Sequence, residues 1–284
     1  MKVVVVGAAG QLGRVTAEQW AREHAVTPLT RREVDLTDAA ALERTLDALA
    51  PELILNCAAW NDVDGAEDTP APAFAVNALA VRSLAAVAAR HAATLVHYST
   101  DFVFDGVDRT TPYTEADAPR PQSVYGTSKL LGEWFAAAAP RAYVLRVESL
   151  FGGVYVRSSV DKLLGLLEQG APLRVFTDRT LTPSYVLDVV DATRRLVLEG
   201  AAPGLYHCVN GGVTTWLELA EELVRLTGRE ATARLEPVPV ASVPMKAKRP
   251  QYCALSNAKL RAAGIEMPEW REALRRHVQR AGAR

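Results

Sequence analysis

The stretch VVVVGAAGQLG at residues 3–13 decides the fold class of this chain. Four β-branched residues predict a short strand, and three glycines follow it with the spacing G-x-x-G-x-x-G. Such glycines allow a tight turn, a close approach of the backbone to a pyrophosphate, and close packing of helix and sheet. A helix that begins there offers its free N–H groups to phosphate. The stretch therefore predicts a dinucleotide site at Gly7, Gly10, Gln11, Leu12 and Gly13.

The first half of the chain alternates strand-like runs with helical patterns. Apolar runs without regular polar alternation, typical of parallel strands covered on both faces, occur at residues 53–56, 94–98 and 143–147. We therefore predict a Rossmann-type, doubly wound α/β fold. Residues 1–150 are expected to form the dinucleotide-binding domain, with a return of the chain near 173–200. Residues 151–284 are expected to form mainly a smaller C-terminal α/β lobe that binds substrate.

Composition and charge exclude several classes of protein. The 284 residues are 49% hydrophobic and 23% charged, which is typical of a soluble globular protein. The 32 basic and 33 acidic residues give a net charge of -1, so we expect a small-molecule partner, no nucleic acid and no membrane. Three scattered cysteines and five histidines without ligand spacing favour a reducing cytoplasm and no metal. The oligomeric state is left open between monomer and homodimer.

The segment after the predicted second strand selects the cofactor. It reads Leu29-Thr30-Arg31-Arg32, without the carboxylate that would bind the adenosine ribose hydroxyls. Arginine pairs with a 2′-phosphate through two parallel hydrogen bonds, so Arg31 and Arg32 favour NADPH, with NADH still possible. The alternative is that both arginines are solvated surface side chains.

Tyr125 and Lys129 form a Y-x-x-x-K pair on a predicted helix over residues 125–138. Residues four apart share one helix face, and an ammonium beside a phenol favours the phenolate and lowers the tyrosine pKa. Such a tyrosine gives a proton to a carbonyl oxygen while hydride reaches the carbon. Ser99 and Thr100 end a predicted strand, where α/β sheets bind ligands, and a hydroxyl there orients the carbonyl.

These residues together resemble the dTDP-4-dehydrorhamnose reductase family, an extended short-chain dehydrogenase/reductase family that acts on nucleotide sugars. The resemblance covers essentially the whole chain. It depends on Asn56-Cys-Ala-Ala, Val63-Asp64-Gly-Ala-Glu67 and Ala75-Val-Asn77-Ala as well as the glycine turn. Ser99-Thr-Asp-Phe-Val-Phe-Asp-Gly106, Val124-Tyr-Gly-Thr-Ser-Lys129, Gly204-Leu-Tyr-His207, Thr214-Thr-Trp216 and Arg249-Pro250 complete it.

The resemblance implies NADPH-dependent reduction of the 4-keto group of a nucleoside-diphosphate 4-keto-6-deoxyhexose. It implies a catalytic set of Thr100, Tyr125 and Lys129. The implied cofactor site adds Asp35, Leu36, Cys57, Ala58, Ala59, Asn77 and Ser99 to the glycine turn, Arg31, Arg32, Tyr125 and Lys129. The implied substrate site comprises Val63, Asp64, Thr100, Asp101, Phe102, Glu148, Ser149 and Arg249, the last at the diphosphate.

Several positions depart from the family pattern. Phe102 replaces a tyrosine, and Arg146-Val-Glu148-Ser149-Leu-Phe151 replaces Arg-Thr-Ser-Trp-Val-Tyr, which alters the sugar pocket and leaves the hexose open. Two other functions stay open at this point. One is a non-catalytic dinucleotide-binding subunit, like the regulatory subunit of methionine adenosyltransferase, and the other is a sugar-nucleotide epimerase or dehydratase. The intact tyrosine and lysine favour the reductase.

Overall fold

The computed structural model describes residues 1–153 and 158–282. Its centre is a six-stranded sheet in the order β10-β5-β4-β3-β1-β2, with every neighbouring pair parallel. The strands are β1 (Lys2–Val6), β2 (Ala25–Leu29), β3 (Leu53–Asn56), β4 (Thr94–Thr100), β5 (Ala142–Val147) and β10 (Gly204–His207). The strand order reverses between β1 and β3, and the crevice at this switch point is where such sheets bind ligands.

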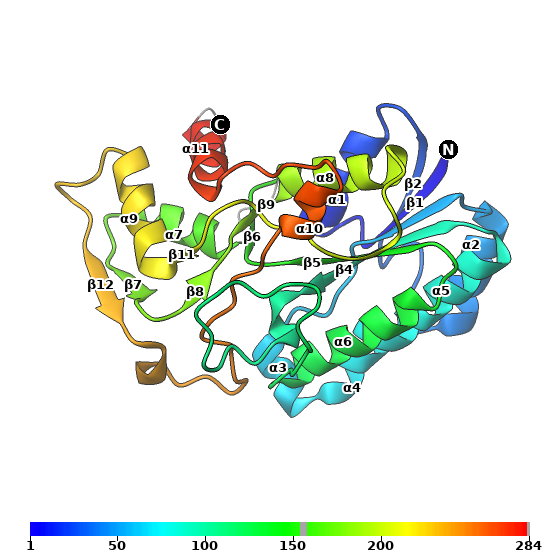
Figure 1. The fold of residues 1–284 in the computed structure, drawn as a ribbon, viewed down its shortest axis with the longest axis horizontal. Helices are drawn as coiled ribbons and strands as arrows, with labels where there is room; N and C mark the ends of the chain where they lie inside the picture. The colour runs from blue at the N-terminus through cyan, green and yellow to red at the C-terminus, as the bar shows by residue number, and fades with distance from the viewer. Residues whose placement is uncertain (154–157, 283–284) are drawn as a thin grey trace.

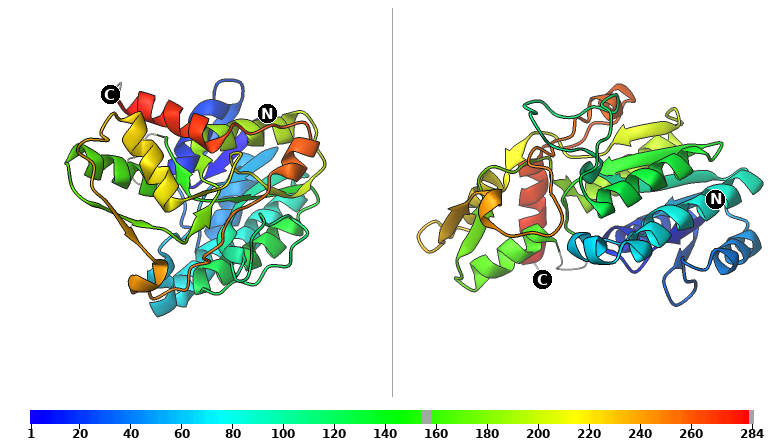
Figure 2. Two further views of the ribbon diagram at one scale, coloured as in Figure 1. Left: turned by 60° about the vertical axis from the view of Figure 1, so that its left-hand side comes forward. Right: turned by 90° about the horizontal axis from the view of Figure 1, so that it is seen from below.

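Helices cover both faces of the sheet (Figure 1). Along β1, Val3 and Val5 enter the core with α1 (Gln11–Trp20), α8 (Val186–Leu198) and α10 (Ala258–Ala262). Val4 and Val6 enter the opposite core, with α2 (Ala39–Leu49), α5 (Ala80–Arg90) and α6 (Val124–Ala137). Figure 2 shows the two groups of helices on opposite sides of the strands. This arrangement confirms the predicted doubly wound α/β fold.

The second half of the chain builds a smaller lobe around its own core. This core includes Leu173, Leu219, Leu223 and Trp270. Its elements are α7 (Ser159–Glu168), α9 (Trp216–Leu226), α11 (Trp270–Gly282), β6 (Leu150–Phe151), β7 (Leu173–Phe176), β8 (Thr180–Leu181), β9 (Ser184–Tyr185), β11 (Thr214–Thr215), β12 (Leu235–Val238) and the 3₁₀ turn η3 (Val240–Ser242). Figure 1 places α7, α9, β7 and β12 together, beside the large sheet.

The chain returns to the large sheet with α8, inside the expected range, and with β10 after it. β7, which we expected within the return near 173–200, pairs with β12 in the small lobe. The return consists of α8, which packs on β1 and β5 residues, and β10, which adds an edge strand beside β5. Leu173 and Val175 of β7 belong to the core of the small lobe, so this strand is part of that lobe.

One helical stretch, Pro70–Arg90, is long and apolar enough to cross a membrane by length and composition. It contains α4 (Pro70–Phe74), a π-helical segment η1 (Ala75–Leu79) and α5. More than half of its most apolar window is buried within the protein, where its side chains contact α2 and α6, so it is a core helix of the α/β layer.

Candidate active site

The glycine turn between β1 and α1 is packed so tightly that it has no room for a side chain at Gly7 or Gly13. Gly7 has φ of +77°, and a Cβ atom there would lie 2.6 Å from the Ala58 nitrogen. A Cβ atom on Gly13 would lie 2.2 Å from the Gly7 carbonyl oxygen. Gly10 caps α1 without any side-chain hydrogen bond, so the first N–H groups of the helix keep their bonding capacity for an anion. The turn therefore fits the pyrophosphate of a dinucleotide.

Two other residues of the turn point their side chains elsewhere. The Gln11 amide nitrogen donates to the Gly152 carbonyl oxygen over 2.7 Å, which ties α1 to the segment after β5. Leu12 lies in the core between sheet and helix. Any contact of these two with a pyrophosphate therefore comes from the backbone.

We expected no carboxylate at the end of β2, and this expectation is wrong, because the Glu33 carboxylate lies there. Arg31 and Arg32 are exposed, but the Glu33 carboxylate folds back to the strand end. It accepts hydrogen bonds from the Thr30 nitrogen at 2.8 Å and the Thr30 hydroxyl at 2.6 Å, and these bonds lower its pKa. A turn at residues 30–34 reverses the chain, so a residue four positions past the strand returns to its end.

Asp35 lies beyond this turn and is exposed. Its carboxylate accepts from the Thr37 backbone nitrogen and hydroxyl, at 2.9 and 2.8 Å, and these bonds lower its pKa. Leu36 packs against the core formed with α2 and α5.

The segment after β3 lies against the glycine turn. Ala58 is the residue that a Cβ atom on Gly7 would strike, and Ala59 follows it. Burial raises the pKa of the Cys57 thiol to about 12, so this cysteine is a neutral packing residue. The segment therefore forms one wall of the predicted cofactor crevice with its backbone.

The Asn77 side chain holds this segment in place through hydrogen bonds to the Trp60 backbone. It is fully buried in the π-helical segment η1, and its amide oxygen accepts from the Trp60 nitrogen at 2.8 Å. Its amide nitrogen donates to the Trp60 carbonyl and to the Ser128 hydroxyl of α6. Single π turns inside helices often occur at functional sites. Asn77 thus connects the cofactor wall to the helix that carries Tyr125.

The structure brings the three predicted catalytic residues together at the carboxyl end of β4. Thr100 is the last residue of β4, and its hydroxyl donates to the Asp101 carboxylate over 2.9 Å. Tyr125 and Lys129 lie one turn apart on α6, which Ser123 caps by accepting from the Gly126 nitrogen. The Lys129 ammonium donates to the Tyr98 carbonyl oxygen over 2.5 Å.

The pKa of Tyr125 departs from the sequence expectation. Burial raises it, and the Asp101 carboxylate raises it further, while the Thr100 hydroxyl lowers it. Lys129 is not among the groups that shift it, because its ammonium is turned to Tyr98. The expectation of a lowered tyrosine pKa is therefore wrong for this structure. The phenol is held protonated, which is the form that a proton donor needs.

Ser99 belongs to a buried network that the sequence did not reveal. Its hydroxyl donates to the Glu133 carboxylate over 2.6 Å, and this carboxylate binds the Arg146 guanidinium through two bonds of 2.8 and 2.7 Å. Glu133 lies on α6 and Arg146 on β5. The Ser99 side chain thus locks α6 to the sheet, which positions Tyr125 and leaves only its backbone toward the cofactor crevice.

The residues predicted to bind substrate form two groups. Asp64, on α3 (Val63–Asp68), pairs with Arg249 through two bonds of 3.0 and 2.7 Å, which lowers the pKa of Asp64 to about 2. Val63 begins the same helix and packs near Tyr125. Phe102 lies edge-on to the Tyr125 ring, with centroids 5.5 Å apart.

The second group lies deeper. Asp101 begins the 3₁₀ turn η2 (Asp101–Val103), and Glu148 follows β5; both side chains are buried. Ser149 adopts a left-handed backbone with φ of 43°, a conformation that costs a serine energy and often occurs at functional sites. Arg179 and Cys253, which we did not predict, lie beside these carboxyl groups.

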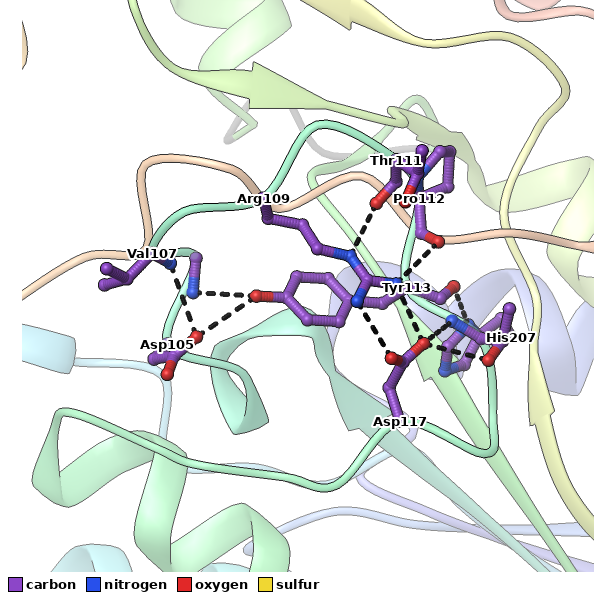
Figure 3. A network of polar contacts seen from close by, with 10 residues as sticks. Asp105, Val107, Arg109, Thr111, Pro112, Tyr113, Asp117 and His207 are labelled. Atoms are coloured by element: carbon purple, nitrogen blue, oxygen red, sulfur yellow. Dashed lines mark hydrogen bonds and ion pairs between the residues drawn. The ribbon is translucent and has the colours of Figure 1, made fainter.

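A loop over residues 105–120 holds the end of β4 against the C-terminal segment (Figure 3). The Arg109 guanidinium lies 4.4 Å from the centre of the Tyr113 ring and binds the Asp117 carboxylate through two bonds. Tyr113 stacks on Phe104, and its carbonyl oxygen lies 3.1 Å from His207 Nδ1. This network fixes the segment that follows Thr100 and Asp101.

The fold and the site define a dinucleotide-dependent reductase of the short-chain dehydrogenase/reductase type. The chain belongs to the family described as the RmlD substrate binding domain, whose model matches residues 1–282. This confirms the family resemblance found in the sequence.

Curated and solved relatives support the same assignment. The chain is 37% identical to the dTDP-4-dehydrorhamnose reductase of Mycolicibacterium smegmatis, over 96% of this chain and 84% of that one. A dTDP-4-dehydrorhamnose reductase from Clostridium acetobutylicum is 33% identical with a TM-score of 0.94, over 99% and 100% of the two chains. The Bacillus anthracis enzyme of the same name, solved with NADP, is 30% identical with a TM-score of 0.92, over 98% and 99%.

Proposed function

We propose that this protein is an NADPH-dependent 4-ketoreductase of a nucleoside-diphosphate 4-keto-6-deoxyhexose, of the dTDP-4-dehydrorhamnose reductase type. The observation that carries the proposal is that Thr100 lies at the carboxyl end of β4 and that Tyr125 and Lys129 share the helix bonded to this strand, two strands from the β1 end that carries the glycine turn. Relatives at 30 to 37% identity carry the name of this reductase, and one was solved with NADP. A non-catalytic subunit has no need of a buried, protonated tyrosine.

The chain's own residues divide the work of the reaction. When bound, NADPH supplies the hydride. Tyr125 gives its phenolic proton to the carbonyl oxygen, and Thr100 orients that oxygen through its hydroxyl. Lys129 ties the tyrosine's helix to β4 and binds the ribose beside the nicotinamide. The glycine turn and the α1 N-terminus bind the pyrophosphate. Gly10, Ala58 and Ala59 supply backbone to the cofactor crevice, while Asp35 and Leu36 lie toward the adenine.

The substrate is proposed to lie over α3 and the C-terminal segment. Arg249 is the cation for its diphosphate, and Asp64, which holds that guanidinium in place, orients it. Val63, Phe102 and Ser149 are proposed to line the sugar pocket.

We propose that the protein acts in the cytoplasm as a monomer or homodimer. Three free cysteines support a reducing compartment. Size-exclusion chromatography with light scattering distinguishes the two oligomeric states.

The test of the proposed function is NADPH consumption with a panel of nucleoside-diphosphate 4-keto-6-deoxyhexoses. We expect oxidation of NADPH in step with ketone reduction, and NMR of the product to show a new C4 hydroxyl. Product formation without net oxidation of NADPH would identify an epimerase. Binding of NADPH without turnover of any ketosugar, together with a stoichiometric protein partner, would identify a regulatory subunit.

A further inference from the structure

The Arg179 side chain has unused hydrogen-bond donors. Among the described residues its guanidinium makes one hydrogen bond, from Nη2 to the Cys253 sulfur over 3.8 Å, and sulfur is a weak acceptor. Its Nε is buried and has no partner. Its Nη1 has none either but, unlike Nε, is not sealed from solvent. A largely buried guanidinium with so few partners needs an explanation.

Two other arginines near the site already have partners. The Arg146 guanidinium binds the Glu133 carboxylate through two hydrogen bonds. Arg249 binds the Asp64 carboxylate in the same way. In the part of the chain that the structure describes, Arg179 makes no such pair. Of these three guanidinium groups, it is therefore the one whose donors are free to bind a ligand.

Arg179 and the catalytic tyrosine contact the same aromatic ring. The guanidinium carbon lies 5.6 Å from the centre of the Phe102 ring, and this ring lies edge-on to Tyr125 with centroids 5.5 Å apart. Phe102 stands where the family pattern has a tyrosine, so it offers no hydrogen-bonding group. The guanidinium thus brings donors to an otherwise apolar wall, one aromatic ring away from the proton donor. This separation is about the length of a hexose with a hydrogen bond at each end.

The backbone on both sides of Arg179 fixes the place of its side chain. Thr180 begins β8, where its nitrogen donates to the Gln251 carbonyl oxygen and its own carbonyl oxygen accepts from the Cys253 nitrogen, both at 2.9 Å. The Asp178 carboxylate accepts from the Gln251 amide at 3.0 Å. Arg179 is therefore held between the small lobe and the C-terminal segment, and binding a ligand need not order it.

The charge around Arg179 favours a neutral group over an anion. Asp101 and Glu148 lie close enough to influence its pKa. Burial is the main cause that raises the pKa of both acids, that of Glu148 to about 8. Near neutral pH Glu148 therefore keeps its proton, and the Asp101 carboxylate balances the guanidinium. A phosphate would add negative charge without compensation, whereas a hydroxyl accepts a hydrogen bond from the guanidinium and adds none.

We propose that Arg179 is a substrate-binding residue that donates to a ring hydroxyl of the hexose, at C2 or C3. This inference rests on the proposed ketoreductase function. Arg249 then holds the diphosphate, and Arg179 holds the hexose. Because both a hydroxyl and a phosphate accept hydrogen bonds from a guanidinium, the experiment has to separate the two.

The test compares wild type with Arg179→Met in the binding of two probes by calorimetry. The probes are dTDP and a dTDP-6-deoxyhexose with hydroxyls at C2 and C3, so they differ only in the sugar. We expect the variant to bind the dTDP-6-deoxyhexose about 10- to 100-fold more weakly than wild type does, the effect of one hydrogen bond from a charged group. The Kd for dTDP should stay unchanged. An equal loss of affinity for the two probes would assign Arg179 to the diphosphate and overturn the proposal.

Analogues that lack the C2 or the C3 hydroxyl identify the group that is bound. Removal of that hydroxyl should weaken binding to wild type but not to Arg179→Met, because the hydrogen bond is then already lost. In turnover, the KM for the ketosugar should rise with little change in kcat, since the hydroxyl is bound alike in the ground state and the transition state. A variant that discriminates against both deoxy analogues as wild type does would overturn the proposal.

The matched control is Arg174→Met, which removes an exposed arginine of β7 and should leave both affinities unchanged. An unchanged Kd for NADPH in Arg179→Met shows that the variant is folded. If that variant fails to fold, the wild type decides alone, because equal affinity for dTDP and the dTDP-6-deoxyhexose would overturn the proposal. If no ketosugar is reduced but the hexose still binds through Arg179, the proposed function fails and this assignment stands.

Discussion

The Lys129 ammonium donates to the Tyr98 carbonyl oxygen at 2.5 Å, which ties the helix that carries Tyr125 to the strand that carries Thr100. The lysine is almost completely buried. Burial lowers the pKa of Lys129 to about 8, and the Glu133 carboxylate offsets part of this effect. A residue that is ordinarily charged up to about pH 10 therefore titrates close to neutral pH.

We expect this pKa to limit activity on the alkaline side. Above pH 8 the ammonium becomes neutral, so NADPH binding and kcat/KM should fall as the pH rises through 8. The folded protein, by contrast, should gain stability from about pH 8 to about pH 10, because only the unfolded chain keeps the proton there. Fluorescence titration of the protein with NADPH, repeated between about pH 6 and about pH 10, measures how the affinity for NADPH changes with pH. An NADPH affinity that does not change with pH would contradict this assignment. So would a Lys129→Met variant whose NADPH affinity falls at alkaline pH as that of the wild type does.

Removal of the Tyr125 hydroxyl should stop the chemistry without stopping cofactor binding. Tyr125→Phe is expected to lower kcat by about 10²- to 10⁴-fold, the usual contribution of a positioned proton donor. The Kd for NADPH should change little because the Tyr125 ring packs against Phe102 and Val63 rather than against the glycine turn. Single-turnover reduction measures the effect. Tyr206→Phe, which removes a hydroxyl bonded to the Ala202 carbonyl at the sheet edge, is the control and should keep its activity.

Local patterns predicted the parts of the site that lie close together in sequence. The glycine turn follows β1 directly, and Tyr125 and Lys129 share a helix face, so spacing alone indicated both. The strand ends were predictable because a parallel sheet places its carboxyl ends at one edge, which put Thr100 near α6.

Features that depend on distant segments could not be predicted in this way. The Glu133–Arg146 pair joins α6 to β5, and Asp101, Glu148, Arg179 and Cys253 come from four segments. Nothing in the local sequence around any of them marks its partner. The return of Glu33 to Thr30 was missed for another reason: the turn after β2 has no glycine or proline to signal it.

Gly13→Ala should open the dinucleotide turn. The new methyl group would lie 2.2 Å from the Gly7 carbonyl oxygen, a backbone atom that cannot move without displacing the turn. We expect NADPH binding to weaken by at least about tenfold and the protein to lose about 1–3 kcal/mol of stability, as for other overpacked positions. Gly165→Ala in α7 is the matched control, since a methyl group there meets no atom within 4 Å. Equal NADPH affinity in the two variants would contradict the close approach.

Glu133→Gln should destabilise the protein more than any surface change. The carboxylate neutralises the buried Arg146 guanidinium and also accepts from Ser99. Removal of one partner from a buried ion pair leaves the other charge uncompensated, which costs about 3–5 kcal/mol. Denaturant unfolding of the variant measures the loss. The exposed pair Arg14 and Glu18 offers a control, because Glu18→Gln should change the stability by less than about 1 kcal/mol. Equal losses in the two variants would contradict the structural role of Glu133.

The preference for NADPH should depend on the balance of charge at the end of β2. Arg31 and Arg32 are exposed and free to approach a 2′-phosphate, whereas the Glu33 carboxylate, held at Thr30, repels it and is placed to accept from ribose hydroxyls. The double variant Arg31→Ala with Arg32→Ala should lower kcat/KM for NADPH by about 10- to 100-fold and leave NADH almost unchanged, because only NADPH carries the extra phosphate. Glu33→Gln should act in the opposite direction and raise the preference for NADPH. Arg44→Ala, an exposed arginine on α2, serves as the control for a general loss of positive charge. If the arginine variant kept the wild-type ratio of NADPH to NADH, the two arginines would be ordinary surface residues and the glycine turn alone would decide the binding.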